Sequence, residues 1–217
     1  MIQIYNEDCL QALKQMDSNQ FDLGIVDPPY GIKVAKRGHV GGGSSIGPST
    51  MHTIKNWDDS PPPPEYFEHL KRVCKKVIIW GANHFIENIP DSNSSSWLVW
   101  DKQINGDFAD CELAYTNHKT SVKKFVYMWN GFKQGCPDKY KETRIHPTQK
   151  PVALYKWILD NYAKEGYKIL DTHLGSGSIA IACSDMGYDL TAYEIDKEYY
   201  DLALNRLREH QKQLRLF

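Results

Sequence analysis

The sequence predicts an α/β protein with a doubly wound, mostly parallel sheet. Two observations lead to this fold class: short β-type segments alternate with amphipathic helical segments, and glycine-bearing turns join several of them. This alternation is typical of parallel sheets that carry helices on both faces and bind ligands at the carboxyl ends of their strands. At 217 residues, the chain is expected to fold as a single domain covering residues 1–217.

The first quarter of the chain begins this alternation. Residues 2–5 alternate like a short strand, and Asp8 precedes helically spaced apolar residues, so we expect Asp8 to cap a short helix. Residues 21–26 have the apolar pattern of a buried strand that ends at Asp27. Residues 32–60 are too polar and glycine-rich to pack a core, and we expect them to form a mobile loop beside a site at that strand end.

The rest of the chain continues the pattern. After a helix through residues 67–73, the expected strands are 77–80, 97–100, 112–115 and 123–129, the last two in a hairpin-like region. The expected order then becomes helix from residue 151 to near residue 166, strand 167–170, helix 179–186, strand 190–194 and a long helix from residue 197.

The composition is that of an ordinary globular protein, with 41% hydrophobic residues and a formal net charge of -1. Because the net charge is close to zero, any contact with nucleic acid must be local. The five cysteines are scattered and form no CxxC pair, which argues against a disulfide framework and a zinc site, so no metal is predicted. The sequence shows no signal segment and no apolar run of membrane-spanning length, so we expect a cytoplasmic protein without membrane contact.

The strand expected at 21–26 ends in the tetrapeptide Asp27-Pro28-Pro29-Tyr30, which combines an acceptor, a rigid turn and an aromatic ring. An exocyclic amine on a planar base is a poor nucleophile because its lone pair is delocalised. Hydrogen bonds from its N–H groups to the Asp27 carboxylate and the Pro28 carbonyl would favour a pyramidal nitrogen that attacks a methyl sulfonium. Tyr30 offers a face for stacking, and a base must leave the duplex to reach it. A plain turn with a surface tyrosine is the alternative.

A second candidate site is the turn Asp171-Thr172-His173-Leu174-Gly175-Ser176-Gly177-Ser178, which lies between an expected strand and an expected helix. Gly175, Ser176 and Gly177 would let a cofactor approach the backbone closely. Because the third glycine of a dinucleotide fingerprint is missing, a smaller adenosyl ligand fits this turn better. Glu194 ends the next strand, where its carboxylate could accept both ribose hydroxyls. A connecting turn and a surface strand end are the alternatives.

A third candidate is His146-Pro147-Thr148-Gln149-Lys150-Pro151, which leads into a helix. Lys150 could pair with a carboxylate at the methionine end of such a cofactor, while His146 and Thr148 shape the turn. Taken alone, the same residues would fit a solvated helix start.

Together, these three stretches resemble the amino-methylating DNA methyltransferases of the beta arrangement, in which the catalytic tetrapeptide comes early and the cofactor loop late. Trp80-Gly81-Ala82-Asn83 and Trp100-Asp101-Lys102 are also similar to the family's middle segments. The resemblance implies a Rossmann-like class I methyltransferase fold with a circularly permuted motif order. It also implies S-adenosylmethionine as the cofactor, with Asp8 near its adenine and Asp171 in the cofactor loop.

The activity implied is site-specific transfer of a methyl group from S-adenosylmethionine to the N6 amine of a flipped adenine in DNA. Adenine is favoured because the family's cytosine-N4 enzymes more often begin the tetrapeptide with serine, although both chemistries use the same two acceptors. Two other readings stay open: a DNA-binding module with the same fold but no catalysis, and an enzyme that methylates RNA or a protein amide. The resemblance further implies a homodimer and a partner restriction endonuclease as candidate partners.

The resemblance places target recognition between the catalytic and cofactor halves, in the small insertion 116–145. From residue 117 to residue 150 the chain carries eight Lys and Arg residues against two acidic residues. The residues expected to contact DNA are Lys119, Lys123, Lys124, Lys133 and Arg144. A solvated charged face is the alternative for this group.

One departure from the family concerns the cofactor loop, which usually begins Asp-Pro-Phe. This chain has Asp171-Thr172-His173 instead, so the contact that the phenylalanine normally makes is in doubt for His173.

Overall fold

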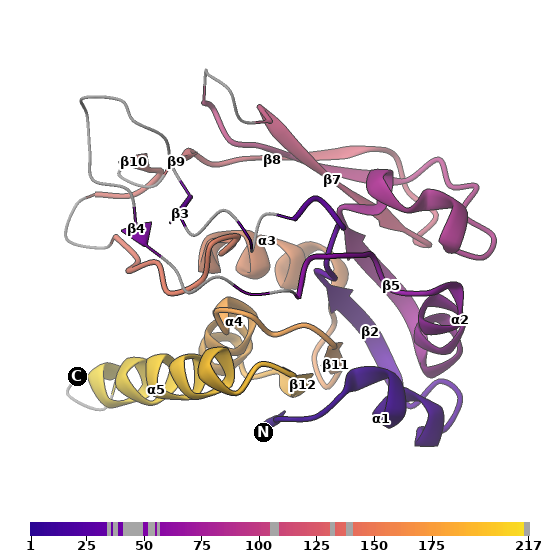
Figure 1. Ribbon diagram of the computed structural model, residues 1–217. Coiled ribbons are helices and arrows are strands. Elements are labelled where there is room, and N and C mark those ends of the chain that lie inside the picture. Colours follow the sequence, from indigo (N-terminus) through magenta and orange to yellow (C-terminus); the bar gives the residue numbers. More distant parts are fainter. Residues whose placement is uncertain are drawn as a thin grey trace.

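The computed structural model describes residues 1–33, 36, 39–40, 50–51, 55, 57–104, 109–130, 133–137 and 141–214. Within them, eight strands form one sheet in the order β1-β12-β11-β2-β5-β7-β6-β8 (Figure 1). These strands are β1 (Ile2–Tyr5), β2 (Phe21–Val26), β5 (Cys74–Trp80), β6 (Trp97–Asp101), β7 (Cys111–Thr116), β8 (Lys123–Val126), β11 (Lys168–Asp171) and β12 (Asp189–Tyr193). Two short antiparallel pairs lie outside it: β3 (His39–Val40) with β4 (Thr50–Met51), and β9 (Trp129–Asn130) with β10 (Lys133–Gln134).

The helices are α1 (Cys9–Gln15), α2 (Pro64–Val73), α3 (Val152–Tyr162), α4 (Ser178–Met186) and α5 (Lys197–Leu214). Asp8 caps α1 as predicted, because its carboxylate accepts a hydrogen bond from the Leu10 backbone N–H at 2.8 Å. No helix in the described part of the chain is both long enough and apolar enough to cross a membrane.

The sheet is mostly parallel, as predicted, and its strand order is permuted relative to the chain. β1, the first strand, pairs in parallel with β12, the last one, with Ile2 opposite Leu190. β11 lies between β12 and β2, so a segment late in the sequence occupies the middle of the sheet. Only β7 runs antiparallel to its neighbours, which are β5 and β6. The sheet therefore brings the early and late thirds of the chain together.

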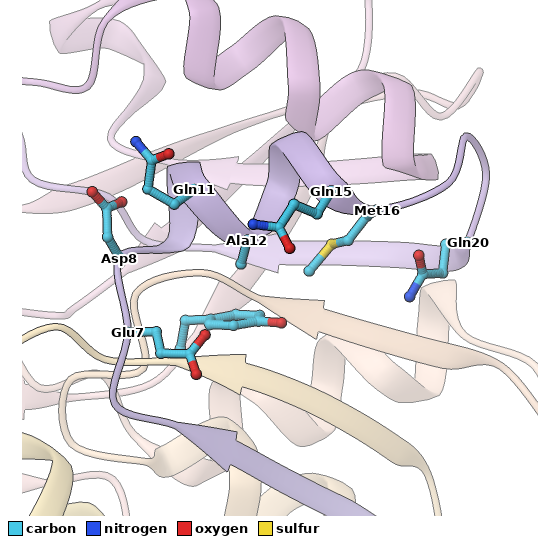
Figure 2. Close-up of a pocket in the computed structure, with 8 residues that line it drawn as sticks. Glu7, Asp8, Gln11, Ala12, Gln15, Met16 and Gln20 are labelled. Atoms are coloured by element: carbon cyan, nitrogen blue, oxygen red, sulfur yellow. The ribbon is translucent and has the colours of Figure 1, made fainter.

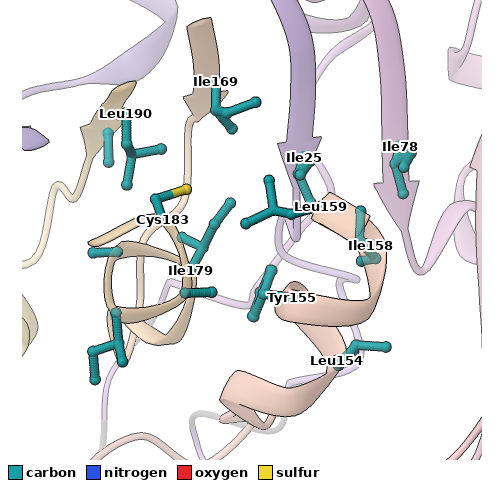
Figure 3. Packing of buried hydrophobic residues seen from close by; sticks show 14 of the residues in the cluster. Ile25, Ile78, Leu154, Tyr155, Ile158, Leu159, Ile169, Ile179, Cys183 and Leu190 are labelled. Atoms are coloured by element: carbon teal, nitrogen blue, oxygen red, sulfur yellow. The ribbon is translucent and has the colours of Figure 1, made fainter. Parts of the chain in front are cut away.

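Helices cover both faces of the sheet, which makes the fold doubly wound. Figure 1 shows α1 and α2 on one side of the central strands and α3, α4 and α5 on the other. Ile25 and Ile78 point toward α3 and α4, where they pack against residues such as Ile158 (Figure 3). Val26 and Ile79 belong to the opposite cluster, with α1 and α2. Central strands with both faces buried read as continuous apolar runs, which explains the sequence of residues 23–26 and 77–80.

Two expectations for the middle of the chain are wrong. Residues 112–115 and 123–129 do not form a hairpin, because β7 and β8 both pair with β6 and lie on opposite sides of it. Between β5 and β6 the alternation also breaks: this connection holds two short 3-10 helices, Ala82–His84 and Ile86–Asn88, instead of an α-helix. The loop predicted at 32–60 falls largely outside the described residues.

Candidate active site

The tetrapeptide Asp27-Pro28-Pro29-Tyr30 and the glycine loop, which comprises residues 171–178, follow neighbouring parallel strands. β2 and β11 pair directly, with Leu23 opposite Ile169 and Gly24 opposite Leu170. Parallel strands end at the same edge of a sheet, so Asp27 after β2 and Asp171 at the end of β11 emerge side by side. The two sites that the sequence places 144 positions apart thus form one site at this edge.

Asp27 and Tyr30 form a compact pair within the tetrapeptide. The Tyr30 hydroxyl donates to Asp27 Oδ1 at 2.7 Å, and the Asp27 side chain is 17% exposed. One face of the Tyr30 ring stacks on His84, with ring centroids 5.0 Å apart and an interplanar angle of 16°. A base stacked on Tyr30 would therefore use the other face of the ring.

Asp58, which the sequence reasoning missed, and Gly81, named there only as part of a family segment, fit closely around the tetrapeptide. Asp58 is buried, and its Oδ1 accepts hydrogen bonds from the backbone N–H groups of Tyr30 and Gly31, each at 2.9 Å. Gly81 has φ +68, and a Cβ there would lie 2.0 Å from the Tyr30 ring. The Trp80-Gly81 segment that resembles a family motif therefore has a steric explanation, since only glycine leaves room for Tyr30.

Lys150 lies beside the tetrapeptide, in what we call the catalytic half of the site. The part around the glycine loop is called the cofactor half. Its Nζ is 2.6 Å from Asp27 Oδ2, 3.0 Å from Glu112 Oε2 and 3.1 Å from the Tyr30 hydroxyl, and its side chain is 3% exposed. Burial alone would lower the pKa of Lys150, but Asp27 and Glu112 raise it above its usual range. The ammonium is thus charged and enclosed by carboxylates of this chain, which gives it a partner other than the cofactor carboxylate expected from the sequence.

The glycine loop has the backbone conformation that the sequence predicts. Gly175 and Gly177 have φ of +53 and +72, and Gly177 begins α4. Glu194, at the end of β12, accepts hydrogen bonds from the backbone N–H groups of Gly175 at 2.8 Å and Asp196 at 2.9 Å. Gly175 after β11 and Glu194 after β12, both predicted cofactor residues, are therefore in direct contact.

Another missed residue, Arg206 on α5, fixes the far end of this loop. Its guanidinium donates to the Ser176 carbonyl at 2.8 Å and to the Ser178 hydroxyl at 2.9 Å. It also forms a 2.6 Å ion pair with Glu142, whose other oxygen accepts from the Val152 N–H at the start of α3. Three segments distant in the sequence are joined through one side chain.

Asp171 is buried and His173 is half-buried at the start of the loop. Burial raises the pKa of Asp171 to about 8, although a hydrogen bond from the His173 backbone N–H at 3.0 Å opposes the shift. Burial also lowers the pKa of His173 to about 4, so its ring is neutral near pH 7. The ring lies against Tyr66 with centroids 5.4 Å apart, and its Nδ1 is 2.9 Å from Thr172 Oγ1. His173 is thus an uncharged aromatic residue at the position of the family phenylalanine.

His146 and Thr148 lie beside the cofactor half. The His146 ring is buried, and its Nδ1 is 3.1 Å from Thr148 Oγ1. It packs against Tyr199 and Trp57, with ring centroids 4.3 Å and 5.0 Å away. A Cβ on Gly175 would be 3.8 Å from the His146 ring. These contacts support the predicted turn-shaping role of the segment.

Lys55, which follows the tetrapeptide in the sequence, also reaches the cofactor half. Its Nζ forms ion pairs with Asp196 at 2.6 Å and Glu198 at 2.9 Å, and it lies 4.0 Å from the centroid of the Tyr199 ring. Sequence reasoning missed this residue because a lone lysine in a polar loop carries no signal of its partners.

A polar cavity of about 530 Å³ opens along α1 (Figure 2). Glu7 and Asp8 lie at the start of the helix, and Tyr193 of β12 lines the same cavity. The exposed Asp8 side chain borders open space next to the end of β12, the strand that carries Glu194.

The basic residues predicted to contact DNA divide into two groups. Lys119, Lys123, Lys124 and Lys133 are exposed. Arg144 is largely buried, its guanidinium donates to the Pro147 carbonyl at 2.7 Å, and burial lowers its pKa. Part of the predicted insertion 116–145 is also built into the main sheet, since β8 is an edge strand of it.

Solved structures of two methyltransferases share this architecture. The crystal structure of the M1.HpyAVI–SAM complex has a TM-score of 0.58 and 20% identity, with 95% of this chain and 100% of that chain covered. The PvuII DNA methyltransferase, described as cytosine-N4-specific, has a TM-score of 0.61 and 9% identity, with 98% and 92% covered. At these identities the likeness concerns the fold, and the predicted Rossmann-like class I methyltransferase fold is confirmed.

Sequence comparison gives the family. The family described as DNA methylase (N6_N4_Mtase) matches residues 87–205, more than half of the chain. The type II methyltransferase M.HpaI of Haemophilus parainfluenzae is 25% identical over 244 residues, which cover 92% of this chain and 72% of that protein. The type II methyltransferase M2.DpnII of Streptococcus pneumoniae is 24% identical over 247 residues, covering 94% and 88%. The chain belongs to the amino-methylating DNA methylases of this family.

Proposed function

We propose that this protein transfers a methyl group from S-adenosylmethionine to the N6 amine of an adenine flipped out of DNA. The observation that carries the proposal is the pairing of β2 with β11, which puts the tetrapeptide beside the glycine loop. A base amine held at Asp27 and a cofactor held at Asp171 and Glu194 would then be neighbours. Methyl transfer requires this proximity.

Asp27 and Pro28 are the residues that would act on the base. Asp27 already accepts from Tyr30 and Lys150, but a carboxylate has about four acceptor positions and retains capacity for an amine N–H. The Pro28 carbonyl would accept from the second N–H. Both bonds favour a pyramidal nitrogen, and the negative charge of Asp27 stabilises the positive charge that develops there.

The cofactor half fits a cationic adenosyl ligand. S-adenosylmethionine supplies an electrophilic methyl group on a positively charged sulfonium. Within the described residues, neither Asp171 nor Glu194 forms an ion pair, and burial raises the pKa of both carboxyl groups. Carboxyl groups buried without a cation favour a positively charged ligand nearby. Asp8, which borders the α1 cavity, is the residue that would lie near the adenine of the ligand.

His173 should be replaceable by phenylalanine. Because its ring is neutral and packs against Tyr66, we expect His173→Phe to keep the affinity for S-adenosylmethionine within about tenfold, in line with the cost below 1.5 kcal/mol of volume-conserving swaps. His173→Ala should leave a cavity against Tyr66 and weaken binding further. Isothermal titration of both variants measures this difference. Equal losses in the two variants would show that the imidazole nitrogens themselves are required.

Analysis of the modified DNA identifies the methylated base and tests the activity in one experiment. Sequencing of DNA from cells that express the protein, with detection of modified bases, is expected to show N6-methyladenine in one recognition sequence. Detection of N4-methylcytosine instead would identify the cytosine N4 amine as the substrate, since the adenine and cytosine amines would use the same two acceptors. Unmodified DNA, combined with no binding of S-adenosylmethionine in titration, would identify a DNA-binding module without catalysis.

The exposed edge strand β8 is the proposed DNA contact. Lys123 and Lys124 are adjacent on this strand, so their side chains leave opposite faces of the sheet. If both reach phosphates, the double variant Lys123→Glu/Lys124→Glu lowers the salt dependence of DNA binding by about two in the log–log slope, and each single variant by about one. Fluorescence anisotropy at several salt concentrations measures the slope.

A matched control exists at the amino-terminal edge of a central strand. Lys168 is exposed at the start of β11, away from the carboxyl edge, so Lys168→Glu should leave the slope unchanged. A slope that also stays unchanged in the β8 variants would place the DNA contact on another surface.

A further inference from the structure

We infer that Glu112 and Lys150 together set the charge state of Asp27 and that both are positioning residues of the methyl-transfer site. The inference rests on the proposed function, because it takes Asp27 as the residue that receives the base amine. Neither the tetrapeptide nor the cofactor loop contains Glu112, which lies on β7.

The geometry is a buried chain of alternating charges. β7 is two strands away from β2, because β5 lies between them, and Lys150 bridges this gap. Its Nζ is 2.6 Å from Asp27 Oδ2 and 3.0 Å from Glu112 Oε2. The other oxygen of Glu112 is 2.5 Å from Lys102 Nζ. Glu112 therefore acts on Asp27 in two ways, through its own charge and through its ion pair with the ammonium between them.

Asp27 is the titrating member of this group. Burial alone would raise the pKa of Glu112, but Lys150 and Lys102 lower it to about 2. Lys150 keeps its proton because both carboxylates raise its pKa. Burial raises the pKa of Asp27, Lys150 opposes this shift, and Glu112 adds to it. The flanking charges thus stay fixed while Asp27 titrates.

Other groups also face Asp27. The Tyr30 hydroxyl donates to it and lowers its pKa. Asp171 and Tyr155 interact with its charge, and the pKa of each is raised, mainly by burial and further by Asp27. Because burial also raises the pKa of Tyr30, both tyrosines stay neutral through the range in which Asp27 titrates. The pKa of Asp171 is about 8, so this carboxyl changes charge near neutral pH, and all variants of Glu112 and Lys150 must keep Asp171.

Charge balance explains why Glu112 is needed. During methyl transfer, positive charge moves onto the amine nitrogen, and the Asp27 carboxylate stabilises it. An ammonium touching the same carboxylate would cancel this effect in a site with little water. Glu112, which also pairs with Lys102, offsets part of the Lys150 charge from the far side, so Lys150 can hold the Asp27 carboxylate in one orientation while that carboxylate keeps more of its effect on the amine than it would beside an unpaired ammonium.

Two single variants and their double variant test this arrangement. The single variants should shift the acid limb of the pH–rate profile in opposite directions. We expect Glu112→Gln to lower kcat about tenfold with KM for DNA unchanged, and to move the acid limb of the pH–rate profile about one pH unit lower. Lys150→Met should move the same limb about one to three pH units higher, because Asp27 loses its cation. In the double variant the two shifts should offset each other in part, so that the limb lies below that of Lys150→Met. Single-turnover methylation of DNA between pH 4.5 and 9 gives these profiles.

Controls separate this mechanism from a structural defect and from failure of the proposed function. Glu209→Gln removes an exposed carboxylate that is paired with Lys212, and it should leave the limb in place. Carbon-13 NMR of labelled aspartate, with Asp27→Asn for assignment, reads the Asp27 pKa without turnover and applies even if wild-type protein transfers no methyl group. If Lys150→Met does not fold, the Asp27 pKa measured in Glu112→Gln tests the inference by itself. An Asp27 pKa that is unchanged or higher in Glu112→Gln overturns the inference.

Discussion

Asp27→Ala is expected to lower kcat for methyl transfer by about 10²- to 10³-fold, the range seen when one preorganised group that stabilises transition-state charge is removed. Alanine removes both the acceptor for the amine and the negative charge beside it. The fold should persist, because Lys150 keeps its ion pair with Glu112 and Asp58 still holds the backbone of Tyr30. Binding of S-adenosylmethionine should change little, since the glycine loop is intact.

Single-turnover transfer of a radiolabelled methyl group, together with titration of the cofactor, checks this expectation. Tyr30→Phe is the matched variant: it removes the hydroxyl that donates to Asp27 Oδ1 but retains the ring that stacks on His84. Its kcat should fall far less, because Lys150 still holds the other oxygen of Asp27. Methylation at the wild-type rate by Asp27→Ala would remove Asp27 from the chemistry altogether.

The sequence was sufficient to predict those parts of the fold and site that have local signals. The apolar runs of β2 and β5, the Asp8 cap and the turn at Gly175 and Gly177 each depend on residues close in the chain. The permuted motif order was implied by the resemblance to the family, and the meeting of the two motifs at one edge follows because parallel strands end at the same edge of a sheet.

The remaining features arise from tertiary contacts that leave no local pattern. Glu112 lies in a strand whose sequence gives no sign of Lys150, and Arg206 lies on a helix far from Ser176. The parallel pairing of β8 with β6 was mistaken for a hairpin because proximity in sequence favours β7 as the partner. Arg144 counted as a surface charge because composition does not reveal that its guanidinium is largely buried.

Cofactor binding should depend on pH through Asp171. Burial raises the pKa of this carboxyl to about 8, so in the free protein it is largely protonated at pH 7. Between the ordinary value of 3.8 and 8 the folded state binds more protons than the unfolded state, so this group lowers stability as pH rises through that window. A bound sulfonium favours the ionised carboxylate. We therefore expect the affinity for S-adenosylmethionine to rise by up to about 50-fold from pH 6 to pH 8, and protons to be released on binding.

Titration calorimetry at pH 7 in buffers with different ionisation enthalpies counts those protons. The ligand's own amino group titrates in the same range, at a pKa of about 8, so two comparisons are needed. Asp171→Asn removes the carboxyl and should leave the smaller pH dependence that belongs to the ligand. S-adenosylhomocysteine has the same amino group but a neutral sulfur, so it should bind wild-type protein with that smaller dependence as well. If wild-type and Asp171→Asn release equal numbers of protons to S-adenosylmethionine, Asp171 does not respond to the sulfonium, and the positive charge is compensated elsewhere, with Glu194 as the next carboxyl to test.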